Sequence, residues 1–475
     1  MANRFWVGGA GTWDASDTTH WAATSNGAGG QSVPGVADTV TFDASSGGGT
    51  VTVNTNLSVV SITMGAFTGT LDFATNNNSP TMSTFNCSGT GTRTLNMGSG
   101  TWTITGSNAT IWTTSTATNL TLDPGSSTVN CTYSGATGTR TIITNTAAIN
   151  NLKVSAGTDV VTFNSTFRCA DLDFTGFSGT GTIGAGSISG SLTLSATMTN
   201  TTSTSVWTFT ATTAKTITSN GVANNRPYTF DGVGGSWTLK DDLSLAGASA
   251  RAITVTNGTL NASDSGANHN VTCGSISSSN SNTRSIIMGN GTWELQGTST
   301  VWTTATATNL TLTPGSSTIK ITDSSNTGNT FAGGSTFANI WWARGASTAT
   351  NTITGTNTFT EFKDTGTAAH SIVFPNVTTT VTSFVVSGSV GNLITLARTG
   401  AAGTFTLSKS SGTVSSDYLS ISNSAAAGGA SWYAGANSTD GGGNSGWIFS
   451  NAPSIISSSG TATSSISNLA ALRIG

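Results

Sequence analysis

Residues 96–129 read NMGSGTWTITGSNATIWTTSTATNLTLDPGSSTV, and residues 287–319 read IMGNGTWELQGTSTVWTTATATNLTLTPGSSTI. Before the first stretch, Arg93 matches Arg284 at an offset of 191 residues (284 − 93). The offset falls to 190 (314 − 124) at Pro314, so the second copy has lost one residue between its two tryptophans. A loop tolerates such a loss, whereas a strand would turn its side chains to the opposite face. The chain therefore contains a duplicated unit whose loops vary in length.

Substitutions between the copies follow one face of a strand. The stretch TWTIT at residues 101–105 becomes TWELQ at residues 292–296, so that the Trp and the next apolar residue stay apolar. The two alternate Thr residues become Glu and Gln. A period of two with one constrained face indicates a half-buried β-strand. We expect Trp102 and Trp293 to point into the core.

The stretch NLTL, present in both copies, repeats this pattern before a Pro-Gly turn. We expect Leu120 and Leu310 to point into the core as well. The four cysteines form no CxxC pair, so their spacing predicts no zinc site. Small, inward-facing core residues are the favoured interpretation, and a disulfide is the alternative. These residues are Cys87, Cys131, Cys169 and Cys273.

Charged residues are scarce in this chain. Asp, Glu, Lys and Arg make up 7% of the 475 residues, against about 25% in an average soluble protein. The net charge of −3 offers no basic surface, so we expect no nucleic-acid partner. The start MANRFWVGG has no apolar signal core, and no stretch approaches a membrane span, so we expect no membrane insertion. The 13 Trp and 19 Phe recur within β-like alternation, which argues against disorder.

The sequence predicts an all-β fold of many short strands. A right-handed parallel β-solenoid with capping segments explains it best, because each coil of a solenoid buries its apolar face only against its neighbours. Tandem β-sandwiches are the alternative, in which Asn257-Gly258 and Asn290-Gly291 would form hairpin turns. We predict four regions along the chain. They are a Trp-rich cap and attachment segment at 1–49, the solenoid body at 50–402, a second cap at 403–449 and a Ser-rich docking tail at 450–475.

Both ends of the chain resemble a known family. The start carries Trp6, Gly8, Trp13, Trp21, Pro34, Asp38, Val40 and Phe42 in the stretch RFWVGGAGTWDASDTTHWAATSNGAGGQSVPGVADTVTF. This stretch and the segment 403–449, which contains SWYAGANSTDGGGNSGWIF, resemble the two ends of β-helical virion proteins of tailed bacteriophages. The start is also loosely similar to the repeat of bacterial autotransporter passengers. We disfavour an autotransporter because we find neither a signal peptide nor a translocator barrel.

The ends of a solenoid expose apolar core and unpaired strand edges, so they need caps. We expect Trp6, Trp13 and Trp21 to form the N-terminal cap. The C-terminal cap should contain Trp432, Tyr433 and Trp447. An aromatic platform for carbohydrate is the alternative role for such residues. The last segment should dock on another chain through its apolar side chains, or fold back on its own rod. Those side chains are Ile466, Leu469, Leu472 and Ile474.

Residues for catalysis or metal binding are sparse. His20, His269 and His370 are scattered, and each lies in a polar context that predicts a surface turn. A glycosidase would need two positioned carboxylates. The candidate pairs are Asp171/Asp173, Asp241/Asp242 and Glu361/Asp364, of which the first shares one strand face. A calcium loop around Asp440 lacks spaced carboxylates. We therefore expect no enzyme activity, no cofactor and no metal.

These observations and the resemblance together predict a structural and adhesive virion protein, acting in assembly and host-surface attachment. The resemblance implies other virion proteins and further copies of the chain, in a homotrimer, as partners. Host surface polysaccharide is the expected external ligand. The alternatives are a polysaccharide-degrading tailspike and a bacterial adhesin or ice-binding solenoid.

Overall fold

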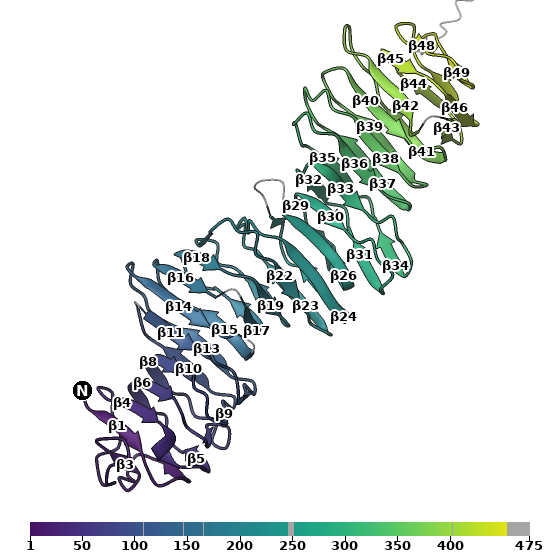
Figure 1. Ribbon diagram of the computed structural model, residues 1–475. Coiled ribbons are helices and arrows are strands. Elements are labelled where there is room, and N and C mark those ends of the chain that lie inside the picture. Colours follow the sequence, from purple (N-terminus) through teal and green to yellow (C-terminus); the bar gives the residue numbers. More distant parts are fainter. Residues whose placement is uncertain (108, 146, 165, 246–250, 401, 454–475) are drawn as a thin grey trace, which may run out of the picture.

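The structure is a computed structural model that describes residues 1–453 except 108, 146, 165, 246–250 and 401. The described residues form short β-strands, up to β49 (Trp447–Ile448), and one short 3-10 helix at Ala44–Ser46. Nearly all strand pairs are parallel, and the coils stack into one rod with the N-terminus at one end (Figure 1). The expected docking side chains Ile466, Leu469, Leu472 and Ile474 lie outside the described residues.

One residue of each coil sits directly above one residue of the next. Val129 pairs with Leu152, Leu152 with Leu172, and Leu172 with Leu192. Successive coils therefore add 23, 20 and 20 residues (152 − 129, 172 − 152 and 192 − 172). This parallel, in-register stacking confirms the β-solenoid and excludes tandem sandwiches. Neither Asn-Gly pair forms the predicted hairpin: Asn257-Gly258 lies inside β26 (Ala252–Asn261), and Asn290-Gly291 lies between β31 (Arg284–Ile287) and β32 (Thr292–Leu295), which pair with other strands and not with each other.

The duplicated units occupy equivalent coils. β10 (Thr101–Ile104) and β32 (Thr292–Leu295) each place a fully buried Trp, Trp102 and Trp293, against the next coil. Trp102 Nε1 donates to the carbonyl of Met97, and Trp293 Nε1 donates to that of the matching residue, Met288, at 3.1 Å. The second copy is one residue shorter in a loop between strands: residues 296–298 of the second copy match residues 105–108 of the first. The prediction that both tryptophans point inward is confirmed.

Leu120 and Leu310 face the core but are only half-buried. They lie on β12 (Leu120–Asp123) and β34 (Leu310–Thr313), and among the described residues each of these strands pairs on one side only, with the preceding coil. Apolar side chains of a solenoid are fully buried only when coils cover them on both sides. The prediction therefore holds for the face and overstates the burial.

A buried arginine fixes the same turn in each copy. Arg93 and Arg284 are almost fully buried, and no carboxylate neutralises either of them in the described part of the chain. Arg284 Nη2 donates to the carbonyls of Ser278 and Thr306, both at 2.6 Å, and Nη1 donates to that of Thr308 at 2.8 Å. Arg93 makes matching bonds to its own coils. The five donors of a guanidinium satisfy carbonyls that a sharp turn removes from the β-ladder.

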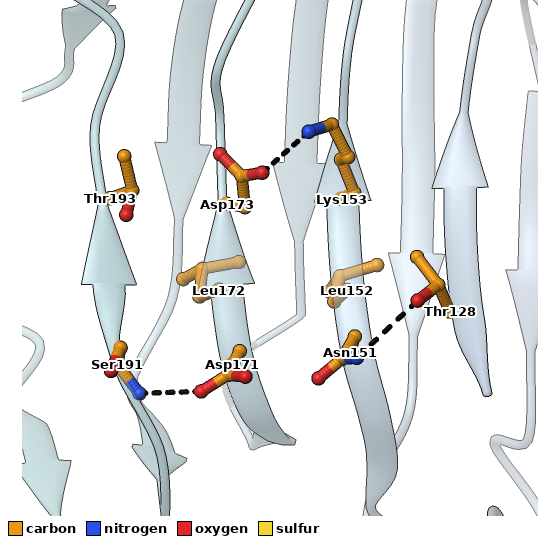
Figure 2. A pocket seen from close by; sticks show the side chains of 9 residues that line it. All are labelled: Thr128, Asn151, Leu152, Lys153, Asp171, Leu172, Asp173, Ser191 and Thr193. Carbon is orange, nitrogen blue, oxygen red and sulfur yellow. Dashed lines mark hydrogen bonds and ion pairs between the residues drawn. The ribbon is translucent and has the colours of Figure 1, made fainter. Parts of the chain in front are cut away.

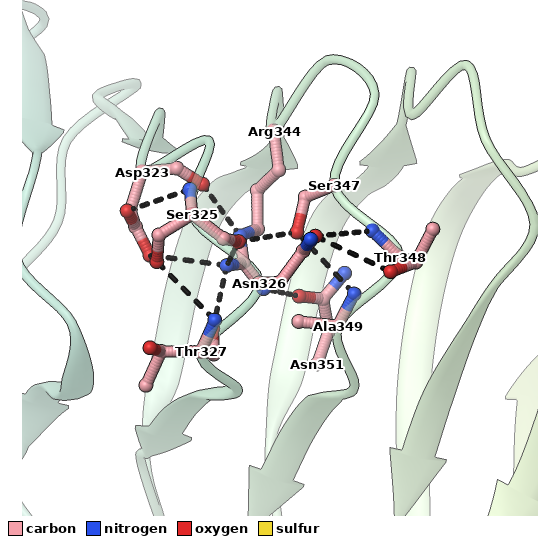
Figure 3. Close-up of polar contacts among 9 residues, drawn as sticks. All are labelled: Asp323, Ser325, Asn326, Thr327, Arg344, Ser347, Thr348, Ala349 and Asn351. Atoms are coloured by element: carbon pink, nitrogen blue, oxygen red, sulfur yellow. Dashed lines mark hydrogen bonds and ion pairs between the residues drawn. The ribbon is translucent and has the colours of Figure 1, made fainter.

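Later in the rod Arg344 has the same role with added carboxylate contact (Figure 3). Its guanidinium donates to the carbonyls of Ser325 and Thr327 at 2.8 and 2.7 Å. It also reaches Asp323 Oδ2 at 3.0 Å and Asn351 Oδ1 at 2.8 Å. The guanidinium thus ties together the turn 323–327 and the start of a later strand.

Aromatic side chains lie at both ends of the described rod. Trp6, Trp13 and Trp21 are fully buried, and the Trp21 ring contacts those of Trp6 and Trp13 with centroids 5.1 and 4.9 Å apart. At the other end Trp432 and Trp447 are buried edge to face at 5.2 Å. Tyr433, also expected in this cap, lies beside Trp432 and is half-buried. The four cysteines are buried and free, as the core interpretation predicted, and none forms a disulfide.

We predict that Trp102→Ala and Trp293→Ala each destabilise the rod by about 3–5 kcal/mol, because each leaves a large cavity between coils. Urea unfolding followed by far-ultraviolet circular dichroism measures the effect. The outward neighbour Thr103→Ala is the control and should change stability by less than about 0.5 kcal/mol. An unchanged midpoint for one of the two Trp variants would contradict the equivalence of the copies.

Candidate functional site

Two equivalent faces of the rod carry candidate polar groups. In the first copy β13 (Thr128–Cys131), β15 (Ile149–Val154) and β17 (Phe167–Asp173) stack in parallel. In the second copy the matching strands are β35 (Thr318–Ile321), β37 (Thr336–Trp342) and β39 (Thr358–Asp364). We define these as the first outward face and the second outward face.

The first outward face contains a groove of about 340 Å³ (Figure 2). Asp171 and Asp173 both point into it, as the strand alternation predicted. Lys153 Nζ lies 2.6 Å from Asp173 Oδ2. Asp171 Oδ1 accepts a hydrogen bond from the backbone N–H of Ser191 at 2.6 Å. Both carboxylates are therefore already engaged by the protein itself.

The protonation state of Asp173 follows from its surroundings. Partial burial acts to raise the pKa of this carboxyl, but hydrogen bonds from Lys153 and Thr175 outweigh burial and lower the pKa below its ordinary value. A glycosidase general acid needs the opposite shift, because it must hold its proton near neutral pH. Asp173 is thus suited to an ion pair rather than to donating a proton.

The second outward face has an aromatic residue where the first has a lysine. The stretch INNLKV at 149–154 aligns with FANIWW at 337–342, which puts Trp341 in the position of Lys153. Every other tryptophan of the chain is buried. Lys320 Nζ and Lys363 Nζ lie 4.9 and 4.6 Å from the centroid of the Trp341 ring. Trp341 Nε1 donates to Thr365 Oγ1 at 2.8 Å.

A groove of about 400 Å³ runs from Trp341 toward earlier coils. Asp242 accepts two hydrogen bonds from Asn270, at 2.8 and 2.9 Å, and so closes the far end of the groove. Glu294 Oε1 accepts from Gln296 and Thr322, both at 3.0 Å. The lining residues are Asp242, Asn270, Thr272, Thr292, Glu294, Lys320 and Trp341.

The other candidate carboxylate pairs do not form dyads. The Asp241 carboxylate accepts backbone N–H groups of Ser219 and Asn220, away from Asp242, whose partners are on Asn270. Glu361 points outward on β39, whereas Asp364 of the same strand is buried. The latter pair is therefore divided between two faces of one strand.

His370 is a buried residue, which contradicts the predicted surface turn. It begins β40 (His370–Phe374), and its Nε2 lies 3.1 Å from Asp364 Oδ2. Its Nδ1 lies 2.8 Å from the carbonyl of Ala368. The sequence context is polar because Asp364 and His370 satisfy each other across a turn inside the rod. Polar neighbours in sequence therefore did not indicate exposure.

The remaining candidates are structural. His20 stacks on Trp6 with ring centroids 4.5 Å apart and bonds the carbonyl of Val7. His269 lies 4.0 Å from Asp242. Asp440 accepts from Gly442 and Asn444 within its own turn. Within residues 1–453, gaps excepted, no three His, Cys, Asp or Glu side chains gather where a metal could bind.

Trp341 is the residue that sequence reasoning missed, although a signal was present. In a strand, successive side chains point to opposite faces, so Trp341 and Trp342 cannot both be buried in one core. Trp342 is fully buried, and Trp341 is the outward member of the pair.

Comparison with known proteins identifies no relative of this chain. No family model, no curated protein and no solved structure matches the chain. Across the described residues, no helix has the length and apolar character to cross a membrane. The class that the structure defines is the parallel β-solenoid.

The His370–Asp364 pair predicts a pH dependence of stability. Burial acts to lower the pKa of His370, but the Asp364 hydrogen bond and charge, helped by the Ala368 carbonyl, outweigh burial and the charge of Arg344 and raise it above 6.5. A raised pKa in the folded state stabilises the fold fully below the unfolded pKa, and this contribution is lost as pH rises through the folded pKa.

We therefore expect the melting temperature of wild type to exceed that of His370→Asn most at acidic pH, with the gap narrowing as pH rises above 6.5. Circular dichroism melts across this pH range measure it. Asp364→Asn, the control, should abolish the pH-dependent part. A gap that widens toward alkaline pH would contradict the assignment.

Proposed function

We propose that this chain is a non-enzymatic structural and adhesive protein of a tailed-phage particle, a fibre, spike or surface decoration that acts in assembly and host-surface attachment. The observation that carries the proposal is the rod itself. The described residues form one uninterrupted stack of coils with a continuous core. A rod of this kind can extend away from a particle and present rows of outward side chains along its length.

The state of the polar groups supports binding over catalysis. Asp173 is held ionised by Lys153 and Thr175, and Asp171 is bonded to the backbone of Ser191. General acid–base chemistry needs a group with a pKa tuned toward neutrality and free access to substrate. The runner-up, a polysaccharide-degrading tailspike, is favoured only by the shared groove of Asp171 and Asp173.

The setting on a virion rests on the resemblance of both ends to β-helical phage proteins. Its partners would be other virion proteins and further copies of this chain in a homotrimer. A chain with 7% charged residues has little electrostatic protection against self-association, which favours an oligomer. Burying neutral Thr and Ser between subunits costs less than burying charge.

The test uses particles that carry Asp171→Asn and Asp173→Asn together. We expect gold-labelled antibody against the chain to mark wild-type and variant particles alike, with equal adsorption to host cells and equal clearing of surface polysaccharide. Lys153→Gln particles, which lose the same ion pair from its other side, are the matched control. Loss of clearing in the double variant alone would establish the depolymerase, and unlabelled wild-type particles would refute the virion role.

A further inference from the structure

We infer that the second outward face and the groove that runs from Trp341 toward earlier coils bind an acidic polysaccharide, with Trp341, Lys320 and Lys363 as the subsite for its carboxylates. The inference rests on the adhesive role proposed above and gives it a site and a ligand class. In-register stacking builds one row across successive strands, with one side chain from each coil. The row consists of Thr272, Glu294, Lys320, Trp341 and Lys363.

The Trp341 ring holds the two ammonium groups in place. Lys320 comes from the coil before Trp341 and Lys363 from the coil after it, and both Nζ atoms lie over the ring. Adjacent strands are about 4.8 Å apart, so the two charges span roughly two coils of the rod. Cation–π attraction keeps both lysines near the surface instead of extended into water.

Neither lysine forms an ion pair with a described residue. Among the described residues, no carboxylate oxygen lies within 4.0 Å of Lys320 Nζ or Lys363 Nζ, the limit for an ion pair. In a chain with only 16 Lys and Arg, two unpaired cations fixed on one ring are a rare feature. On the first outward face, Asn130, Lys153 and Asp173 hold the positions of Lys320, Trp341 and Lys363, and Lys153 forms an ion pair with Asp173. The two ammonium groups beside the Trp341 ring can therefore pair with carboxylates of a ligand.

The rest of the groove suits sugar hydroxyls. Glu294 Oε1 is oriented by Gln296 and Thr322, and Asp242 is oriented by Asn270, so each carboxylate is held in place. Oriented carboxylates accept hydroxyl hydrogen bonds well. The same carboxylates would repel the closely spaced phosphates of nucleic acid. The lining has one aromatic residue and no apolar pocket for a peptide side chain.

A polymeric ligand that contacts both ends of the groove must carry separated carboxylates among many hydroxyls. An acidic polysaccharide lying along the rod has this chemistry: its carboxylates pair with Lys320 and Lys363, and its hydroxyls donate to Glu294 and Asp242. Pairing of exposed charges is weakened by salt, so binding should fall as sodium chloride rises.

The experiment is affinity electrophoresis of the full chain in gels that contain alginate, hyaluronan, pectate or xanthan. We expect at least one of these polymers to retard the wild type, with about tenfold weaker retention of Trp341→Ala and of Lys320→Gln/Lys363→Gln. Lys153→Gln, at the matching position of the first face, should bind as wild type does. Circular dichroism melts of each variant verify that the rod is folded, and Trp341→Phe, which keeps a ring, should restore part of the binding.

Four outcomes would overturn the inference. None of the four polymers retards the wild type, or the Trp341→Ala variant is retarded as strongly as the wild type. Alternatively, polyphosphate or neutral dextran retards the wild type as strongly as the acidic polysaccharides do. A separate assay of wild-type and Trp341→Ala particles on host cells keeps the two proposals apart. Equal adsorption of these two kinds of particle would rule out the site and leave the adhesive role. The adhesive role would be ruled out if particles on which antibody cannot reach the chain adsorbed to host cells as well as particles that the antibody labels.

Discussion

The rod depends on one constraint: an inward side chain of each coil can be buried only by the coils before and after it. Trp102 lies against Val129, which lies against Leu152, and in the second copy Trp293, Ile319 and Ile340 repeat this row. Apolar burial contributes about 25 cal/mol per Å² and has no preferred direction, so it fixes which face turns inward and little else. Parallel hydrogen bonding between coils then sets the register.

Because the inward rows hold the rod, the outward positions are free to diverge. Glu294 stands in the place of Thr103 and Trp341 in the place of Lys153, and the parallel pairing of the strands that carry them is kept. The buried arginines belong to the constrained part, since Arg93 and Arg284 bond equivalent carbonyls in both copies. The duplication thus supplied two copies of one scaffold, and among the described residues the half-buried Trp341 with Lys320 and Lys363 belongs to the second copy alone.

Face-selective substitution predicted the strands, the solenoid and the inward Trp102 and Trp293, because burial restricts residue type directly. Partial exposure of Leu120 and Leu310 was not predictable, since it depends on where a sheet ends, which no local pattern records. The burial of His370 was missed for a similar reason: its partner Asp364 is six residues away, across a turn. The Trp341 site needed three coils to be aligned, and only the fold supplies that alignment.

The most direct test of the stacked register is disulfide formation between engineered outward cysteines on known coils. Asn130 pairs with Lys153, and Lys153 pairs with Asp173, so Asn130 and Asp173 are two coils, roughly 9.6 Å, apart. A disulfide needs Cα atoms about 4.4–6.8 Å apart. The native thiols do not compete, because they are buried and burial raises their pKa, that of Cys131 to about 12.

We predict that Asn130→Cys/Lys153→Cys forms an intramolecular disulfide on mild oxidation, detected by mass spectrometry of the unreduced digest, and that Asn130→Cys/Asp173→Cys does not. Efficient bonding of the second pair, or none of the first, would contradict the in-register solenoid.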